Sequence, residues 1–170
     1  MTIPTLTTER LVLRAPCADD FDGYALFYAD AEASGAYGGP LSAGEAWRKL
    51  LSDLGHWQVR GYGMWTVCWR ETGQMAGGCG LVWPYDWPCP ELTWWVLPDA
   101  RRKGVAMEAS RAAIQFGYDQ LGWDEVCTYM NDDNIPAQTL AEKLGGRIKA
   151  RVECPDGLSR NIYVLPRLQG

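Results

Sequence analysis

A short strand pattern that runs through a basic turn into an amphipathic helix constrains the fold of this chain more than any other feature. Residues 91–96, which read ELTWWV, are rich in β-branched and aromatic side chains and are followed by Pro98. From Gly104 to about Gly122, apolar residues recur with the spacing of one helix face, at Val105, Ala109, Ala112, Ala113 and Phe116. The segment therefore predicts a strand, a turn and a helix in a layered α/β fold.

The rest of the chain adds strands and helices on both sides of this unit. Alternating or apolar patterns bounded by turn residues predict strands over residues 10–14, 64–69, 75–83, 91–96, 126–130, 147–153 and 158–165. Helices are predicted after Asp19 or Asp20, after a capping box at residues 42–45, and from Pro136 to Gly145. No repeat, low-complexity tract or linker divides residues 1–170, so we expect a single domain.

Charge and hydropathy exclude several classes of protein. The formal net charge is -5 and the pI is near 4.9, which argues against a protein whose main task is binding nucleic acid. The first ten residues do not resemble a secretory signal, and no apolar run approaches the ~18 residues of a membrane span. We therefore expect a cytoplasmic protein with no nucleic-acid and no membrane partner.

The cysteines and the single histidine argue against a metal centre. The chain has six cysteines but no C-x-x-C pair, so we interpret them as small buried thiols in a reducing compartment. His56 has no second imidazole to join it in a zinc site. The sequence predicts no metal cofactor and no histidine-dependent triad.

The basic turn between the strand and the helix has the chemistry of a phosphate site. Residues 101–106 read RRKGVA and combine basic side chains, a glycine that permits close approach of the backbone, and free N–H groups at a helix start. The alternative is a solvated basic turn that only caps the helix. Neither G-x-x-x-x-G-K-[ST] nor G-x-G-x-x-G after a strand is present, so other nucleotide loops do not fit.

Residues 91–109 resemble the coenzyme A signature of GNAT acetyltransferases. That signature is arginine or glutamine, two variable residues, glycine, one variable residue, then glycine or alanine, and Arg101, Gly104 and Ala106 match it. The similarity extends to residues 134–137 and 140–145, and residues 8–14 resemble the branch related to ribosomal-protein-alanine N-acetyltransferases. Strand, motif, helix, strand and asparagine-led helix follow in the order typical of the family.

The resemblance implies a fold and a cosubstrate. The fold is a mixed, mainly antiparallel sheet of six or seven strands with helices on both faces, split by a V-shaped opening after the strand that ends at Val96. The cosubstrate is acetyl-coenzyme A (acetyl-CoA), with its pantetheine arm entering the split and its pyrophosphate held by the basic loop. The residues implied to bind it are Trp95, Val96, Leu97, Arg101, Arg102, Lys103, Gly104, Val105, Ala106 and Asn134.

Direct attack of an amine on a thioester needs a proton acceptor, and Glu91 is the candidate base. Its position at the start of the strand beside the cleft suits that role, although a solvated charge at a strand end is the alternative. The proton donor is less defined, because Ala137 and Ala141 stand where many relatives carry serine or tyrosine. Three alternatives remain for this step. Water, Tyr129 or Tyr163 protonates the thiolate, or positioning of the reactants alone suffices, or catalysis is poor.

Gly146 also departs from the family, because it replaces the aromatic residue that is usual after that helix.

Aromatic residues dominate the loop where the family binds its acceptor. Trp83, Tyr85 and Trp94 are candidates to wall an acceptor pocket for a primary amine of a small molecule or a protein N-terminus. The alternative is packing in the core or between two copies of the chain in a homodimer. The second functional hypothesis is a non-catalytic domain that binds or senses acyl-coenzyme A.

Overall fold

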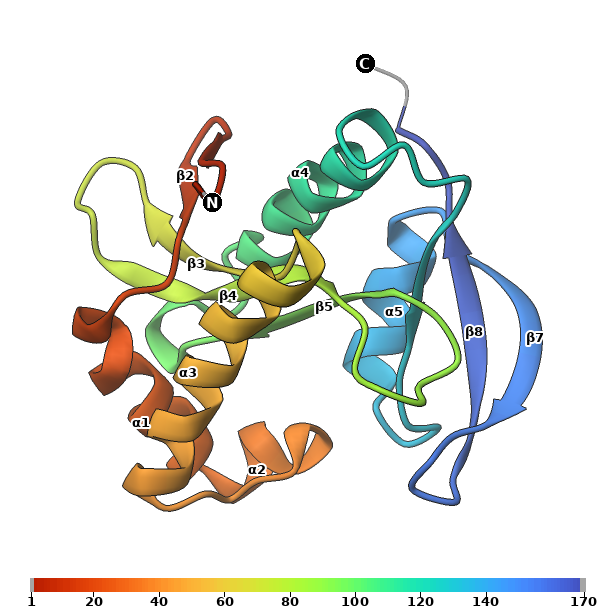
Figure 1. Cartoon of the computed structure of the whole chain (residues 1–170), viewed down its shortest axis with the longest axis horizontal. Helices are drawn as coiled ribbons and strands as arrows, with labels where there is room; N and C mark the ends of the chain where they lie inside the picture. The colour runs from red at the N-terminus through yellow and green to blue at the C-terminus, as the bar shows by residue number, and fades with distance from the viewer. Residues whose placement is uncertain (1, 169–170) are drawn as a thin grey trace.

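A mixed sheet of eight strands forms the middle layer of the computed structural model, which describes residues 2–168 (Figure 1). The strands are β1 (Leu6–Thr7), β2 (Leu11–Arg14), β3 (Met64–Trp69), β4 (Met75–Val82), β5 (Glu91–Val96), β6 (Val126–Tyr129), β7 (Arg147–Glu153) and β8 (Ser159–Leu165). Their order in the sheet is β1-β2-β3-β4-β5-β6-β8-β7, and every neighbouring pair is antiparallel except β5 with β6. The predicted fold class is confirmed; the additional strand is the two-residue β1, which no sequence pattern indicated.

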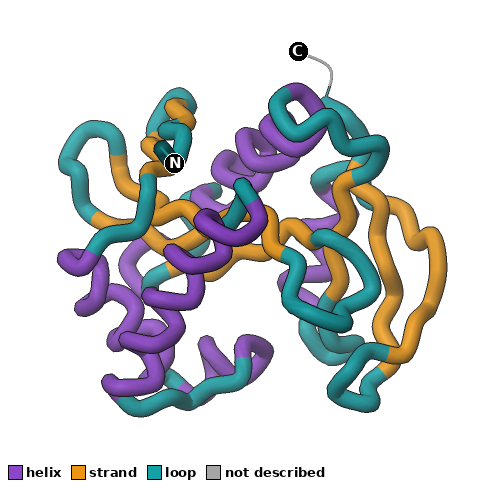
Figure 2. Tube along the Cα trace, in the orientation of Figure 1, coloured by secondary structure: helices purple, strands orange, loops and turns teal. Residues whose placement is uncertain are grey.

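Helices cover both faces of this sheet (Figure 2). Helices α1 (Phe21–Ala29) and α3 (Ala43–Arg60) lie on one face, with the short α2 (Ala31–Ser34) between them, and α4 (Val105–Asp119) and α5 (Ile135–Lys143) lie on the other. Strand β5 shows the two layers directly, because Trp95 packs against α1 whereas Trp94 and Val96 pack toward α4 and α5. No helix within residues 2–168 is long and apolar enough to cross a membrane.

Local sequence signals set where the helices begin. The predicted capping box is present at α3, where the Ser42 backbone N–H donates to the Glu45 carboxylate at 2.8 Å. Helix α5 follows Asn134, whose side-chain oxygen accepts the backbone N–H of Ala137 at 3.2 Å. Helix α4 instead begins after Gly104, which has a φ of +79° and no side chain to act as a cap.

The sheet splits between β5 and β6. Strand β5 pairs with β4 along its whole length, from Glu91 to Val96, but it pairs with β6 only where Glu91 lies opposite Cys127. Beyond that point the two strands diverge, and one edge of β5 is left without a neighbouring strand. The predicted V-shaped opening is therefore confirmed.

Candidate active site

The open edge of β5 presents the backbone of alternate residues. Three side chains mark its direction, because the carbonyl oxygen of Leu92 accepts from Thr128 at 2.8 Å, that of Val96 accepts from Arg101 at 3.3 Å, and that of Trp94 accepts from Tyr37. Since N–H and C=O of one strand residue point to the same side, the N–H groups of Trp94 and Val96 also face the split.

The neighbouring backbone groups of β5 point toward β4 instead. The N–H of Leu97 donates to the carbonyl oxygen of Ala76 at 2.8 Å, and Trp95 follows the same alternation. The Trp95 indole is buried against α1 and lies over Gly78, where an added Cβ would approach its Nε1 to 2.4 Å. The structure therefore turns Val96 toward the split and directs the backbones of Trp95 and Leu97 away from it.

The basic loop leaves a run of donors free at the start of α4. Among the described residues, no protein acceptor lies within hydrogen-bonding geometry of the backbone N–H groups from Arg102 to Met107. Arg102 and Gly104 both adopt positive φ, of 59° and 79°, which turns successive N–H groups toward one side. This concave set of donors, with Arg101, Lys103, Val105 and Ala106 around it, is suited to an anion.

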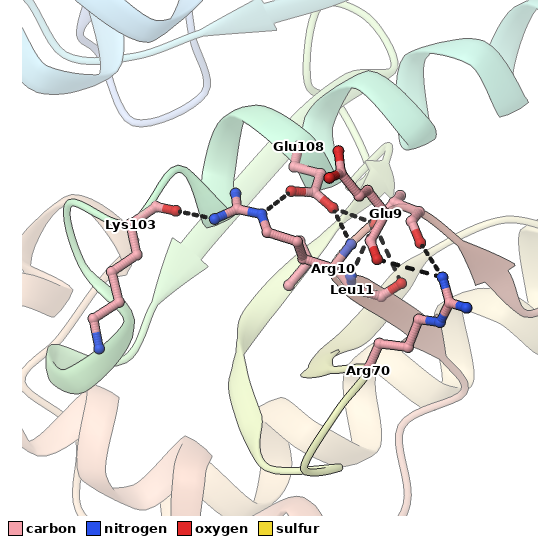
Figure 3. A network of polar contacts seen from close by, with 7 residues as sticks. Glu9, Arg10, Leu11, Arg70, Lys103 and Glu108 are labelled. Carbon is pink, nitrogen blue, oxygen red and sulfur yellow. Dashed lines mark hydrogen bonds and ion pairs between the residues drawn. The ribbon is translucent and has the colours of Figure 1, made fainter.

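The turn before β2, at residues 8–10, braces this loop from outside the signature (Figure 3). The guanidinium of Arg10 donates to the carbonyl oxygen of Lys103 at 2.9 Å and pairs with the carboxylate of Glu108 on α4 at 2.7 Å. Thr8 also donates to Glu108, at 2.6 Å. Burial alone raises the pKa of Glu108, but these partners outweigh it and hold that pKa below its usual value.

Two adjoining cavities lie beside β5. The fork cavity, of about 120 Å³, occupies the split and is lined by residues that include Glu91, Thr93, Trp94, Tyr129, Ala137 and Arg160. The outer cavity, of about 480 Å³, lies on the α1 and α3 face and is lined by residues that include Tyr28, Tyr37, Asp53, His56, Trp87 and Trp95. Six residues line both cavities and form their boundary: Ala36, Tyr37, Trp87, Glu91, Thr93 and Arg160.

Glu91 therefore stands at the junction of the two cavities. Burial of its carboxyl group raises its pKa to about 8, against the opposing influence of the Tyr129 hydroxyl and of the Lys49 and Arg160 cations. A carboxyl group with a pKa near the working pH exchanges protons readily, which is the property required of a general base.

Arg160 and Trp87 hold the boundary in place. Both guanidinium Nη atoms of Arg160 pair with the Asp156 carboxylate, at 2.8 and 2.6 Å, and its Nε donates to Asn131 at 2.9 Å. Its guanidinium also lies 5.3 Å from the Trp87 ring, whose other neighbour is Tyr129 with a centroid separation of 5.7 Å. Neither Arg160 nor Tyr37 carried a sequence signal for this position, because only the fold brings them to β5.

The single histidine is held by two backbone groups. The Nε2 atom of His56 accepts the backbone N–H of Trp83 at 3.0 Å, so its Nδ1 carries the proton donated to the carbonyl oxygen of Tyr62 at 2.7 Å. His56 lines the outer cavity with both nitrogens occupied, which leaves Glu91 as the better placed base.

The alanines that replace the family's hydroxyl residues face a tryptophan. Ala137 and Ala141 on α5 are buried together with Met130 and Tyr163, and the Trp94 side chain packs against this group. The indole thus takes up volume that larger side chains on α5 would need.

Gly146 also has a packing reason. A Cβ at this position would lie 2.7 Å from the carbonyl oxygen of Ala141 and 3.0 Å from Leu165. An aromatic side chain therefore does not fit here without a shift of the backbone.

The three aromatic acceptor candidates separate in the structure. Trp94 lines the fork cavity, but Tyr85 is 88% exposed and Trp83 lies among the residues of neither cavity wall. Trp83 is held by its indole N–H, which donates to the carbonyl oxygen of Trp87 at 2.9 Å, and by Arg60 over its ring. The aromatic walls of the outer cavity come instead from Trp87, Trp95 and the tyrosines of the α1 to α3 region.

Comparison with known families accounts for this arrangement. The family model described as "Acetyltransferase (GNAT) domain" matches residues 10–147, and the chain belongs to that family. GNAT members use acetyl-CoA as the acyl donor, so the protein is an N-acetyltransferase. The predicted family and enzyme class are confirmed.

Individual relatives agree with this assignment. The chain is 27% identical over 151 residues to YkkB of Bacillus subtilis (strain 168), covering 82% of this chain and 83% of YkkB. The solved acetyltransferase of Agrobacterium tumefaciens str. C58 matches with a TM-score of 0.88 at 29% identity, covering 98% of this chain and 96% of its own. The apo structure of RimL, a ribosomal L7/L12 alpha-N-protein acetyltransferase, shares the fold with a TM-score of 0.77 at 13% identity and coverage of 95% and 93%.

Proposed function

We propose that this protein transfers the acetyl group of acetyl-CoA to the primary amine of a small molecule bound in the outer cavity. The observation that carries the proposal is the position of Glu91, which lines both cavities and whose carboxyl pKa is raised to about 8. A cavity of about 480 Å³ lies in the size range of small-molecule sites, and its aromatic walls suit a cationic amine. These features favour a small amine over a protein N-terminus.

The residues of the split and the loop fit the donor. The N–H groups of Trp94 and Val96 face the split on the open edge of β5, where an extended pantetheine can pair with them, while the carbonyl oxygens of the two residues accept from Tyr37 and Arg101. The free N–H groups from Arg102 to Met107 fit the pyrophosphate, with Asn134 at the start of α5 on the far side of the split. The alternation of β5 supports Trp94 and Val96 as the pairing residues in place of Trp95 and Leu97.

The chain supplies a base and an oxyanion donor in this arrangement. Glu91 takes the proton of the attacking amine, directly or through one water, because it lies between the cavity for the amine and the split for the thioester. The N–H of Trp94, on the open edge near the start of the split, is the candidate donor to the developing oxyanion. Binding the two reactants in adjoining cavities also lowers the activation barrier, because their encounter and orientation are already fixed.

A panel assay tests this function. The wild-type protein is incubated with acetyl-CoA and a set of primary amines that includes aromatic amines, polyamines, amino acids and short peptides, and release of the coenzyme A thiol is followed. We expect release with at least one small amine and strong loss of that rate in Glu91→Gln. Preference for peptides would instead assign a protein N-terminus as acceptor.

The second hypothesis, a non-catalytic acyl-coenzyme A sensing domain, rests on Ala137 and Ala141. Tight binding of acetyl-CoA by calorimetry, combined with no thiol release from any amine of the panel, would favour it over the transferase.

A further inference from the structure

A buried hydroxyl without a partner lies at the vertex of the split. The Tyr129 side chain is 7% exposed and lines the fork cavity, yet its hydroxyl has no partner with hydrogen-bonding geometry among the described residues. A buried polar group in this state costs stability, so it calls for an explanation, and a substrate atom that completes the hydrogen bond provides one.

The fold places this hydroxyl beside Glu91 on the same face of the sheet. Glu91 lies opposite Cys127 in the single β5–β6 pair, and Tyr129 follows two residues later on β6, so both side chains point to the same face. Stacking on Trp87, with an interplanar angle of 8°, fixes the orientation of the Tyr129 ring. Tyr129 is therefore the first β6 side chain on this face beyond the point where the strands separate.

We infer that Tyr129 is the proton donor to the leaving sulfur of coenzyme A. Glu91 then returns a proton to the Tyr129 oxygen. This inference rests on the proposed transferase function. The phosphate loop lies beyond the far end of β5, so a donor whose pyrophosphate binds there and whose arm follows the open edge brings its thioester to the vertex between Glu91 and Tyr129.

The proton balance closes within this pair. The amine nitrogen bonds to the acyl carbon, the carbon–sulfur bond breaks, and its electron pair leaves on sulfur. The amine proton passes to Glu91, the Tyr129 hydroxyl proton passes to sulfur, and Glu91 returns a proton to the Tyr129 oxygen. One proton has moved from nitrogen to sulfur, and both side chains end in their starting states.

The energetics explain why the two residues act together. Burial, with the nearby Glu91 carboxylate as a further cause, raises the pKa of Tyr129 above its usual value, so a free phenolate does not accumulate. Even a cysteine thiol has an ordinary pKa of ~8.5, above the value of about 8 for Glu91, so proton transfer from Glu91 to an alkyl thiolate is not uphill. Tyr129 can therefore relay this proton without forming a stable phenolate.

Several other charged or titratable groups face this pair and contribute to any pH profile. They come from the α1 to α3 region, the 83–90 loop and the β7–β8 hairpin: Tyr37, Lys49, Cys89, Cys154, Asp156 and Arg160. A pH profile is therefore compared between variants that differ in one hydroxyl only.

The first test removes only that hydroxyl. Tyr129→Phe keeps the ring on Trp87, and we expect the rate of thiol release with the best amine of the panel to fall by ~10²-fold or more, the usual contribution of an acid–base group. The urea midpoint should not fall, because the hydroxyl has no hydrogen-bond partner among the described residues of the free protein. The matched control is Tyr163→Phe, a buried tyrosine on β8 that belongs to neither cavity wall and should keep its rate.

A second readout does not depend on the acceptor. Coenzyme A is bound to each protein, and the pKa of its thiol is followed by thiolate absorbance after subtraction of the protein alone. We expect Tyr129→Phe to raise the thiol pKa relative to wild type, because the thiolate loses its hydrogen-bond donor. Tyr163→Phe should leave it unchanged.

The two readouts separate the possible failures. A wild-type protein that releases no thiol with any amine refutes the transferase function, while the thiol pKa still decides whether Tyr129 contacts the sulfur. Equal thiol pKa values in wild type and Tyr129→Phe, or full turnover in Tyr129→Phe, would overturn the assignment of Tyr129. A loss in Tyr163→Phe alone would move the donor to Tyr163.

Discussion

Arg10 and Glu108 form an ion pair of 2.7 Å that joins the residue before β2 to the first turn of α4 across 98 positions of sequence. The same guanidinium donates to the carbonyl oxygen of Lys103, so Arg10 contacts both the basic loop and the helix that follows it (Figure 3). An anion site built from backbone N–H groups depends on such bracing, because loosely held donors lose entropy when they bind.

Arg10→Gln should weaken acetyl-CoA binding without changing the chemical step. Loss of a hydrogen bond to the loop costs about 1 kcal/mol net, which corresponds to about a fivefold rise in the dissociation constant. Isothermal titration measures this constant. The control is Arg70→Gln, because Arg70 lies in the same patch but contacts the carbonyls of Thr8 and Glu9 and not the loop. Equal losses in both variants would show a general charge effect in place of bracing.

Gly104→Ala should abolish most of the affinity for acetyl-CoA. Gly104 has a φ of +79°, and an added Cβ would lie 3.0 Å from the Arg10 guanidinium, so the variant disturbs the brace and the approach of the ligand together. Gly122→Ala is the matched control, with a φ of +66° and open space around the new Cβ. Both variants should lose ~1–2 kcal/mol of stability from the left-handed backbone. Only Gly104→Ala should lose binding by calorimetry.

Much of the fold was predictable because its signals are local. The capping box at Ser42, the glycine before α4 and the asparagine before α5 each specify a helix start within a few residues. The strand at residues 91–96 and the loop after it were predicted with the bounds that the structure has. Helix α2 and strand β1 were missed, since four and two residues carry too little periodicity.

The walls of the site were less predictable because they depend on which face of a strand each residue occupies. Trp94 and Trp95 are adjacent in sequence but lie on opposite faces of β5, one in the fork cavity and one in the outer cavity. The brace from Arg10 and the boundary residues Tyr37 and Arg160 come from distant segments. A single sequence contains no pattern that joins such positions.

The rate of acetyl transfer should rise with pH through about 8. Glu91 accepts a proton only when it is deprotonated, and its pKa in the folded protein is raised to about 8 by burial. In Glu91→Gln the rate should be low, by ~10²-fold or more, and this rise should be missing. The measurement is kcat/KM between pH 6 and 9.5, with one amine for both proteins so that its own titration is common to the two. A rise of unchanged size in Glu91→Gln would move the base to another group.

The same shift predicts a trend in stability. Because the pKa of Glu91 is higher in the folded chain than its ordinary value of 4.5, the folded state binds the proton more tightly. Its contribution to the free energy of unfolding is complete below pH 4.5 and decreases as the pH rises through about 8. Urea unfolding at several pH values should show a smaller decrease in Glu91→Gln than in wild type. Parallel curves for the two proteins would contradict the raised pKa.

Tyrosine at position 141, which restores the residue that many relatives carry, should destabilise this chain because Trp94 takes up the space. Ala141 is fully buried, and the indole of Trp94 packs against the group formed by Ala137, Ala141, Met130 and Tyr163. Overpacking of a core costs ~1–3 kcal/mol, so Ala141→Tyr alone should lower the free energy of unfolding by about that amount.

Trp94→Ala alone leaves a cavity and should cost ~3–5 kcal/mol. In the double variant the phenol ring can enter the volume that the indole vacates, so the two losses should not add, and a coupling energy of ~0.5–3 kcal/mol is expected. Urea unfolding of the four proteins measures it, with Ala137→Ser as a control that adds only one oxygen. Strict additivity would show that Trp94 and position 141 do not compete for the same space.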